Sequence, residues 1–188
     1  MKVFYLILAL AGLTAIPAMA TEVGIQFDQM KVGVKLTTTT AGFYQATYIE
    51  EYVGRKDGFH LTQTHKLLDD GSTKRLNQVG YDNQGRKVFS ILNGNKNTYE
   101  PYSCHYVVGR CQHTYRYYNS LTKKFVTNVT RFENRLDGDT LFVGTYKSDG
   151  DKFEVPFKLG PYRLRLSSEY KNALGKPAGF RFVDLVQP

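Results

Sequence analysis

Four side chains that can bind a metal or exchange electrons lie within ten residues of one another. The segment SCHYVVGRCQH contains both cysteines of the chain, Cys104 and Cys111, and two of its four histidines, His105 and His113. Thiolates and imidazoles are the preferred ligands of zinc, and two thiols can form a redox couple or a structural disulfide. The spacing of the four residues indicates which of the three applies here: a metal site, a redox couple or a structural disulfide.

The spacing favours a structural disulfide. The zinc spacings C-x2-4-C and H-x3-5-H and the redox spacing C-x-x-C are absent from this segment. Residues 99–106 and 112–118 are rich in aromatic and β-branched side chains, which predicts two strands joined by a short turn. If Cys104 faces Cys111 across that hairpin, His105 and His113 lie on opposite faces and the four side chains cannot converge.

We therefore predict a Cys104–Cys111 disulfide that stabilises one hairpin by about 2–3 kcal/mol and takes no part in chemistry. Metal binding and free thiols remain the alternatives. Neither a metal site nor a cofactor is predicted for this chain.

The sequence contains none of the common catalytic motifs. The nucleophile elbow G-x-S-x-G, the zinc motif H-E-x-x-H, the phosphate-binding loop and the EF-hand pattern do not occur. His60 and His65 point to opposite faces of a strand, and the adjacent acids at 50–51 and 69–70 also diverge. We name no catalytic residue and do not expect an enzyme, although a site assembled from distant residues would leave no motif.

Basic residues occur as doublets at or beside predicted turns. One interpretation is a solvated surface, and the other is weak contact with anionic lipid, lipopolysaccharide or acidic polysaccharide. Another envelope protein is a further candidate partner, whereas no motif supports nucleic acid. The doublets are Arg55-Lys56, Lys74-Arg75, Arg86-Lys87 and Lys123-Lys124.

Short strands must position all of these residues. Asp-Gly and Asn-Gly turn signals recur, as at Asp57-Gly58 and Asn93-Gly94, and the segments between them have the length and composition of strands. An antiparallel meander with that many strands should close into a barrel or fold into a two-sheet sandwich. The candidate strands are 31–39, 43–53, 58–68, 73–81, 86–92, 98–107, 111–118, 125–135, 140–148, 152–159, 162–170 and 180–186.

Two segments are ambiguous, and two others alternate clearly. Residues 42–53 fit a helix or a strand, and residues 168–174 could form one or two helical turns. In 152–159 we expect Phe153, Val155, Phe157 and Leu159 to line the core, opposite the charged side chains. In 162–170 the alternation sets Tyr162, Leu164, Leu166 and Tyr170 opposite Arg163, Arg165 and Glu169.

The first twenty residues are predicted to be a secretory signal peptide. Lys2 precedes an apolar run, and Ala18-Met19-Ala20 is a cleavage pattern, so the mature chain begins at Thr21. Residues 21–188 then form a single β-rich domain without a transmembrane helix. Removing Lys2 from the 25 basic residues leaves 24 against 17 acidic ones, a net charge of +7. We expect a periplasmic or extracellular protein, and we favour a bacterial source.

These observations predict an exported barrel or sandwich with a binding or structural role. Its ligand would be an anionic envelope component or a small apolar molecule. The first alternative is an integral outer-membrane barrel of eight strands, although segments 58–68 and 73–81 lack an apolar face. The second alternative is a periplasmic enzyme. The sequence does not identify the ligand or the oligomeric state.

Overall fold

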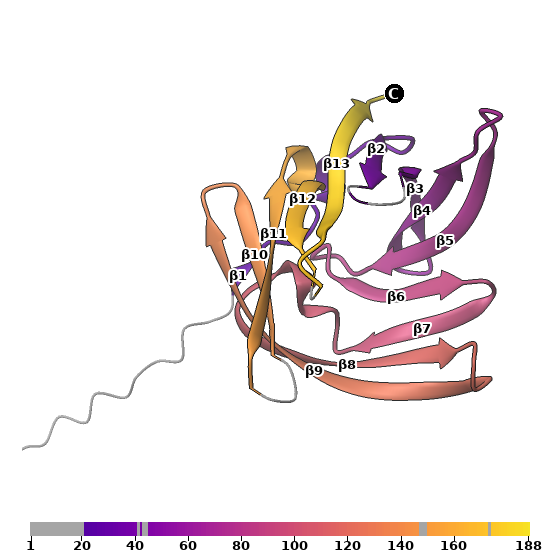
Figure 1. Ribbon diagram of the computed structural model, residues 1–188. Coiled ribbons are helices and arrows are strands. Elements are labelled where there is room, and N and C mark those ends of the chain that lie inside the picture. The colour runs from indigo at the N-terminus through magenta and orange to yellow at the C-terminus, as the bar shows by residue number, and fades with distance from the viewer. Residues whose placement is uncertain (1–20, 41, 43–44, 147–149, 173) are drawn as a thin grey trace, which may run out of the picture.

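The structure is a computed structural model that describes residues 21–40, 42, 45–146, 150–172 and 174–188. Within these residues, regular structure consists of β-strands and three turns of 3-10 helix. The predicted all-β antiparallel class is confirmed (Figure 1). The signal peptide predicted for residues 1–20 lies outside the described residues.

The strands form one continuous antiparallel sheet that closes on itself. Each strand from β2 to β13 pairs with the next strand along the chain, and β13 pairs with β2, so twelve strands make an up-and-down barrel. Strand β1 adds to the start of β8. The strands are β1 (Thr21–Glu22), β2 (Lys35–Thr40), β3 (Thr47–Lys56), β4 (Phe59–Leu67), β5 (Thr73–Tyr81), β6 (Lys87–Leu92), β7 (Asn95–Glu100), β8 (Val107–Asn119), β9 (Lys124–Asp137), β10 (Thr140–Tyr146), β11 (Lys152–Leu159), β12 (Arg165–Lys171) and β13 (Pro177–Val186).

Each of the twelve predicted segments overlaps one strand from β2 to β13. The turn chemistry explains this agreement, because Asp57 and Gly58 have φ values of 51° and 84°, as a two-residue hairpin turn requires. The ambiguous residues 42–53 contribute to strand β3. The helical turns considered for residues 168–174 are wrong, because β12 continues as a strand to Lys171.

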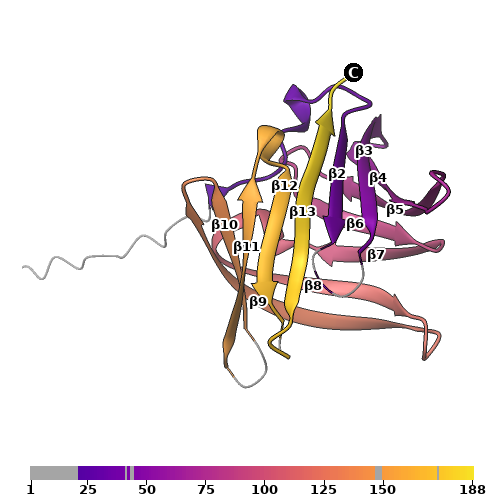
Figure 2. The same cartoon turned by 45° about the horizontal axis from the view of Figure 1, so that its top comes forward.

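The N-terminal residues 23–34 fill one end of the barrel, and we call them the plug (Figure 2). A barrel of eight strands is just wide enough to be filled by its own side chains, so twelve strands leave room for a further segment. The plug contains the 3-10 turn η1 (Phe27–Gln29). Its backbone donates from Val23 to Tyr106, from Ile25 to Gly85 and from Gln26 to Tyr162, at 3.0, 3.2 and 3.0 Å.

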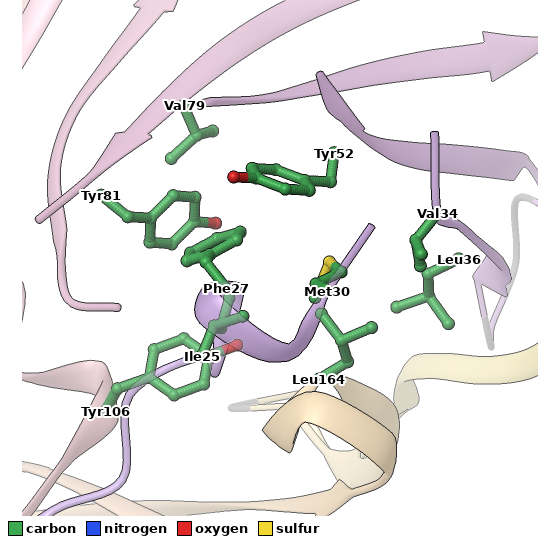
Figure 3. Packing of buried hydrophobic residues seen from close by; sticks show 10 residues of the cluster. All are labelled: Ile25, Phe27, Met30, Val34, Leu36, Tyr52, Val79, Tyr81, Tyr106 and Leu164. Carbon is green, nitrogen blue, oxygen red and sulfur yellow. The ribbon is translucent and has the colours of Figure 1, made fainter. Parts of the chain in front are cut away.

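The hydrophobic core sits where the plug meets the barrel wall. Phe27 stacks on His60, with ring centroids 4.9 Å apart, and tilts against Tyr52 and Tyr81 at 5.0 Å. A second cluster packs around the disulfide. The main cluster, drawn in Figure 3, consists of Ile25, Phe27, Met30, Val34, Leu36, Tyr52, Val79, Tyr81, Tyr106 and Leu164.

Strand β11 largely follows the predicted alternation. Phe157 and Leu159 pack against the second cluster, and Phe153 packs edge-on against Tyr170. Lys158 is exposed on the opposite face. Phe153, Val155, Phe157 and Leu159 are all partly buried, so none of the four predicted core residues is fully enclosed.

Two irregular registers reverse the expected direction of two cations. The pairing of β5 with β6 shifts between Gly80 and Tyr81, and it sets Lys87 opposite the buried Tyr81. The pairing of β11 with β12 shifts between Lys158 and Leu159, beside Arg165. Such bulges turn a side chain to the other face of a sheet. Arg165 and Leu164 line the same cavity, so the prediction that they lie on opposite faces is wrong.

Among the described residues, no helix has the length and apolar character needed to cross a bilayer.

Candidate functional site

A cavity of about 360 Å³ lies inside the barrel, next to the plug. Ile25 of the plug lines it, together with Leu36, Leu164 and Phe180 from the barrel wall. Its volume falls in the range of about 300–1,000 Å³ found for small-molecule sites. One acidic side chain, Glu50, and three basic ones, Lys87, His105 and Arg165, are among the described residues that line it.

Glu50 is the one acidic side chain among the described residues that line this cavity. It extends from β3, and its Oε1 atom accepts hydrogen bonds from the Thr62 hydroxyl at 2.8 Å and from the Tyr81 hydroxyl at 3.3 Å. Burial, and next the nearby Glu50 carboxylate, raise the pKa of Tyr81 well above its ordinary value. The Tyr81 phenol therefore stays protonated and serves as a donor to Glu50.

Lys87 brings a primary amine into the cavity. Its Nζ atom lies 5.0 Å from the centre of the Tyr99 ring, a cation–π contact. Burial lowers the pKa of Lys87, and the Glu50 carboxylate partly opposes that shift. An anion beside this amine would therefore be stabilised by an incompletely solvated positive charge.

Arg165 contributes the second cation. Its guanidinium carbon lies 4.3 Å from the Tyr106 ring centre and 3.9 Å from that of Phe157, and its Nη2 donates to the backbone carbonyl of His105. The Nε atom is shielded from solvent and has no hydrogen-bond partner among the described residues. A buried donor without a partner is costly, so this side chain retains an unused capacity to bind an acceptor.

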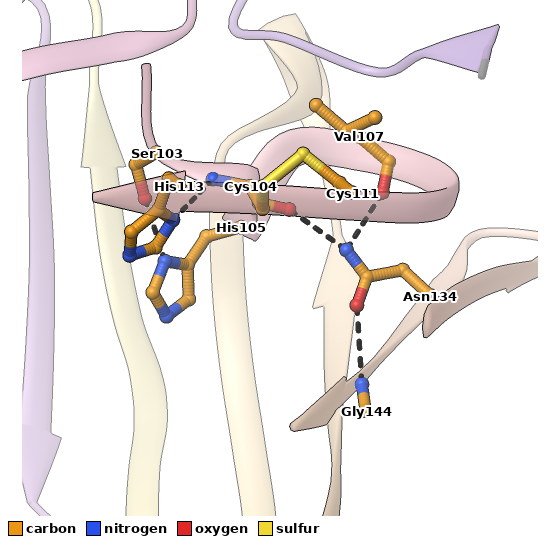
Figure 4. The surroundings of a disulfide bond; sticks show 8 residues. All are labelled: Ser103, Cys104, His105, Val107, Cys111, His113, Asn134 and Gly144. Atoms are coloured by element: carbon orange, nitrogen blue, oxygen red, sulfur yellow. Dashed lines mark hydrogen bonds between the residues drawn. A yellow bond between two sulfur atoms is a disulfide. The ribbon is translucent and has the colours of Figure 1, made fainter. Parts of the chain in front are cut away.

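The disulfide holds the turn that carries three of the cavity residues (Figure 4). Cys104 begins the 3-10 turn η2 (Cys104–Tyr106), and its sulfur lies at bonding distance from that of Cys111 in β8, with the Cα atoms 5.7 Å apart. Asn134 donates to the carbonyls of Cys104 and Val107, both at 2.7 Å. Ser103, His105 and Tyr106 line the cavity from this turn.

The hairpin predicted around the cysteines is wrong in detail. Residues 107–119 form the single strand β8, and the strand partner of Cys111 is Phe132 of β9. Cys104 instead lies in the connection between β7 and β8. The disulfide thus joins a turn to a strand, and the stapled turn belongs to the cavity wall rather than to a remote hairpin tip.

His105 and His113 lie close together, which corrects the prediction of opposite faces. Their ring centroids are 6.1 Å apart, and both rings pack against Phe132. His113 Nδ1 accepts the backbone N–H of Cys104 at 3.0 Å, so this nitrogen carries no proton. Burial lowers the pKa of His113 to about 4 and that of His105 well below its ordinary value. Both rings are therefore neutral at pH 7.

In the described part of the chain, no group of three or more His, Cys, Asp or Glu side chains is placed to hold a metal ion. The thiols are engaged with each other, and His113 uses one ring nitrogen on Cys104.

The four basic doublets do not form one surface. Arg55 donates to Asn83 at 2.9 Å, which brings the first doublet beside the 82–86 turn, where Arg86 pairs with Asp82 at 2.7 Å. Lys87 points into the cavity instead of toward solvent. The remaining positions are Lys56 at the end of β3, Lys74 and Arg75 at the start of β5, and Lys123 and Lys124 at the turn before β9.

Register relates one further doublet residue to a strand that lines the cavity. Lys74 lies opposite Lys66, and Lys66 lies opposite Tyr48, which lines the cavity. Directly paired residues project to the same side of a sheet. Lys74 is exposed at the start of β5, and neither lysine lines the cavity.

Sequence reasoning missed Glu50, Tyr81 and Arg165 as a group, because they come from three distant strands. Only one signal was available. Gly80 lies inside a strand pattern, and an isolated glycine there indicates a bulge or a close approach. The Phe89 ring does cover Gly80, where an added Cβ would meet it at 2.2 Å. That bulge is what turns Lys87 inward.

No family model, no curated protein and no solved structure matches this chain.

Proposed function

We propose that the barrel binds a small amphipathic anion in its lumen, with the anionic group near Lys87 and Arg165. One observation carries this proposal: two cationic side chains face a single carboxylate, Glu50, in a cavity whose other walls are largely apolar and aromatic. A ligand carboxylate, sulfate or phosphate would balance the second cation and would accept from the Arg165 Nε atom.

The walls around this charge suit an apolar body. Leu36, Leu164 and Phe180 line the cavity. Tyr99, Tyr115 and Tyr117 continue as a stack along β7 and β8, with successive ring centroids 4.6 and 5.0 Å apart. Aromatic rings bury much apolar area and keep a polar end, which matches a ligand with one charged head.

Isothermal titration calorimetry with three ten-carbon probes tests the proposal. Decanoate, decanol and decylamine share a chain and differ in the charge of the head. We expect decanoate to bind at least about tenfold more tightly than the other two, equivalent to about 1.4 kcal/mol. Equal affinities, or no binding of decanoate, would contradict a lumen selective for anions.

Matched variants locate the bound head group. Lys87→Met keeps the length of the side chain and removes its charge, so decanoate affinity should fall about tenfold. Lys56→Met makes the same change at an exposed hairpin position and should leave the affinity within about twofold. Loss of affinity in both variants would point to long-range charge alone.

We further propose that the mature chain works outside the cytoplasm, in the periplasm or the extracellular space. The apolar run with its A-x-A pattern and the cysteine pair at disulfide distance support this location. Basic residues at the hairpin ends, such as Arg55 and Lys123, would then attract anionic lipid, lipopolysaccharide or polysaccharide weakly. Release by osmotic shock tests the location.

The charged side chains on the outer face of the barrel favour a barrel surrounded by water. Ion pairs occur there between Lys35 and Glu51 at 3.7 Å and between Arg135 and Glu154 at 3.0 Å. The outer-membrane alternative assumed eight strands, whereas the barrel has twelve. A lipid-facing band would require apolar side chains at these outward positions.

Catalysis by Lys87 is a second candidate function. A lysine with a lowered pKa inside an apolar cavity is a nucleophile for carbonyl compounds, and Glu50 lies close enough to influence it. The amine would add to an aldehyde and lose water to give an imine. Incubation with decanal and cyanoborohydride, followed by peptide mass spectrometry, should then label Lys87 before Lys56. Equal labelling would exclude a special reactivity of Lys87.

A further inference from the structure

Half of strand β9 has a partner on one side only. Its pairing with β10 covers residues 132–137 and stops at Phe132, opposite Thr145. Residues 124–131 pair with β8, and within the described residues no strand lies along their other edge. Figures 1 and 2 show this half of β9 running outward as the outer strand of the long β8–β9 hairpin. We call residues 124–131 the β9 edge.

The β9 edge is open on both faces as well. Phe125 and Val129 are 43% and 60% exposed, and Asn128 on the opposite face is also exposed. The sequence KFVTNVTR is rich in residues that favour strands. A long exposed edge of this composition is a template for a further strand, and natural proteins usually protect such edges.

The direction of the free backbone groups follows from one hydrogen bond. The N–H of Tyr118 donates to the Asn97 side chain on the β7 side, at 2.9 Å, so it points away from β9. Tyr118 lies opposite Phe125 in the β8–β9 ladder, so these two residues form a non-hydrogen-bonded pair. The backbone groups of both residues then point away from the strand that carries the other. The N–H and C=O groups of Phe125, and by alternation those of Thr127 and Val129, therefore point to the open edge.

The surroundings of the edge are basic. Lys124 and Arg131 terminate it, and Arg110 and Arg116 project from the neighbouring β8. A groove of about 900 Å³ lies beside it, lined in part by Val129, Arg131 and Arg110. A second copy of the same edge fits poorly, because pairing two copies would bring Lys124, Arg131 and the neighbouring arginines of two basic surfaces together, and like charges repel.

We propose that the β9 edge binds an extended, acidic segment of a partner protein by adding it to the sheet as a strand. Main-chain hydrogen bonds would supply affinity, and the arginines and Lys124 would select acidic side chains. This inference is independent of the lumen ligand, because the edge and the cavity share no residue.

The test uses a soluble peptide of eight residues in which glutamate alternates with valine, titrated by fluorescence anisotropy into the full chain. Thr127→Pro removes one outward N–H and leaves the β8 ladder intact, since proline is tolerated where an edge N–H faces solvent. We expect about tenfold weaker peptide binding by this variant. Thr127→Val keeps the N–H and should bind within about twofold of wild type.

A peptide methylated at alternate backbone nitrogens gives a second readout that does not depend on the folding of the proline variant. The methylated peptide keeps its charge. It should not bind when the methylated nitrogens are those that face β9, because they can no longer donate hydrogen bonds to the edge. Unchanged binding by the methylated peptide or by Thr127→Pro would overturn the proposal in favour of plain charge attraction. Self-association through the edge, seen by sedimentation, or binding to phosphatidylglycerol vesicles but not to the peptide, would also overturn it.

Discussion

The neutral state of the two histidines follows from what surrounds each ring. His105 accepts or donates through Nδ1 to the Ser103 hydroxyl at 2.6 Å, while burial and the nearby Arg165 oppose a positive charge on it. His113 is 4% exposed and is fixed as an acceptor by the Cys104 N–H. A proton on either ring would add a positive charge beside Lys87 and Arg165.

The free energy of unfolding should therefore fall as the pH is lowered from 7 to 4. The unfolded chain binds protons at histidine near pH 6.5, whereas burial lowers the pKa of His113 in the folded state to about 4. Between these values the unfolded state holds more protons, so stability is complete above about pH 6.5 and is lost toward pH 4, by about 3 kcal/mol. Urea unfolding at several pH values measures this slope.

The variant His113→Asn should flatten that pH dependence. An asparagine oxygen can replace Nδ1 as the acceptor for Cys104 without binding a proton. His65→Asn is the control, because the His65 Nε2 atom has no hydrogen-bond partner to lose. A slope that is the same in His113→Asn and in wild type would show that other groups cause the acid sensitivity.

Neighbouring positions in β11 should differ sharply in their contribution to stability. Phe157 packs against the second cluster and under the Arg165 guanidinium, so Phe157→Ala should cost about 3 kcal/mol. Lys158 is exposed and pairs with Asp139, and Lys158→Ala should cost less than about 1 kcal/mol. Thermal melts with similar shifts for both variants would contradict the assignment of faces.

At the scale of elements, the plug depends on a close approach of two backbones. An added Cβ at Gly85 would lie 2.0 Å from the carbonyl oxygen of Ile25, and its φ of +72° is unfavourable for other residues. Gly58 has a φ of +84° with no atom within 4 Å of an added Cβ. Both glycines have a positive φ, but only Gly85 lies against another segment. Substituting each one therefore separates the cost of backbone strain from the cost of a steric clash.

Gly85→Ala should therefore destabilise the protein more than Gly58→Ala. The first combines backbone strain with displacement of the plug and should cost about 2–3 kcal/mol, whereas the second should cost about 1 kcal/mol. Chemical denaturation measures both values. Equal costs would mean that the plug is not packed against the 82–86 turn.

The disulfide should be present in the protein isolated from an oxidising compartment. Alkylation of the native protein without reductant, followed by mass spectrometry, should modify neither Cys104 nor Cys111. Replacing both by serine should cost about 2–3 kcal/mol. It should also weaken decanoate binding, because the stapled turn carries Ser103 and His105 into the cavity. Two alkylated thiols in the native protein would disprove the disulfide.

The elements were more predictable than the directions of their side chains. Turns such as Asp57-Gly58 and Asn93-Gly94 have local signals, so the strands between them could be located. Bulges have weak sequence signals, and two of them turn Lys87 and Arg165 toward the barrel interior. The turn η2 has no local sequence signal, since the aromatic and β-branched residues around Cys104 are typical of a strand.

At the scale of the whole molecule, the number of strands produces the site. Twelve strands enclose more space than their side chains fill, and the plug occupies one end of it, so a cavity remains with side chains from distant strands around it. The sequence predicted a meander but not whether it would close, because closure depends on the pairing of β2 with β13 across the length of the chain.

The most direct test of this account is a crystal structure of the protein bound to decanoate. We predict that the carboxylate lies within hydrogen-bonding distance of Lys87 Nζ and the Arg165 guanidinium, with the chain against Leu36, Leu164 and Phe180. An empty lumen in a protein that binds decanoate in solution, or a carboxylate placed away from both cations, would contradict the central claim that the barrel interior is an anion-selective binding site.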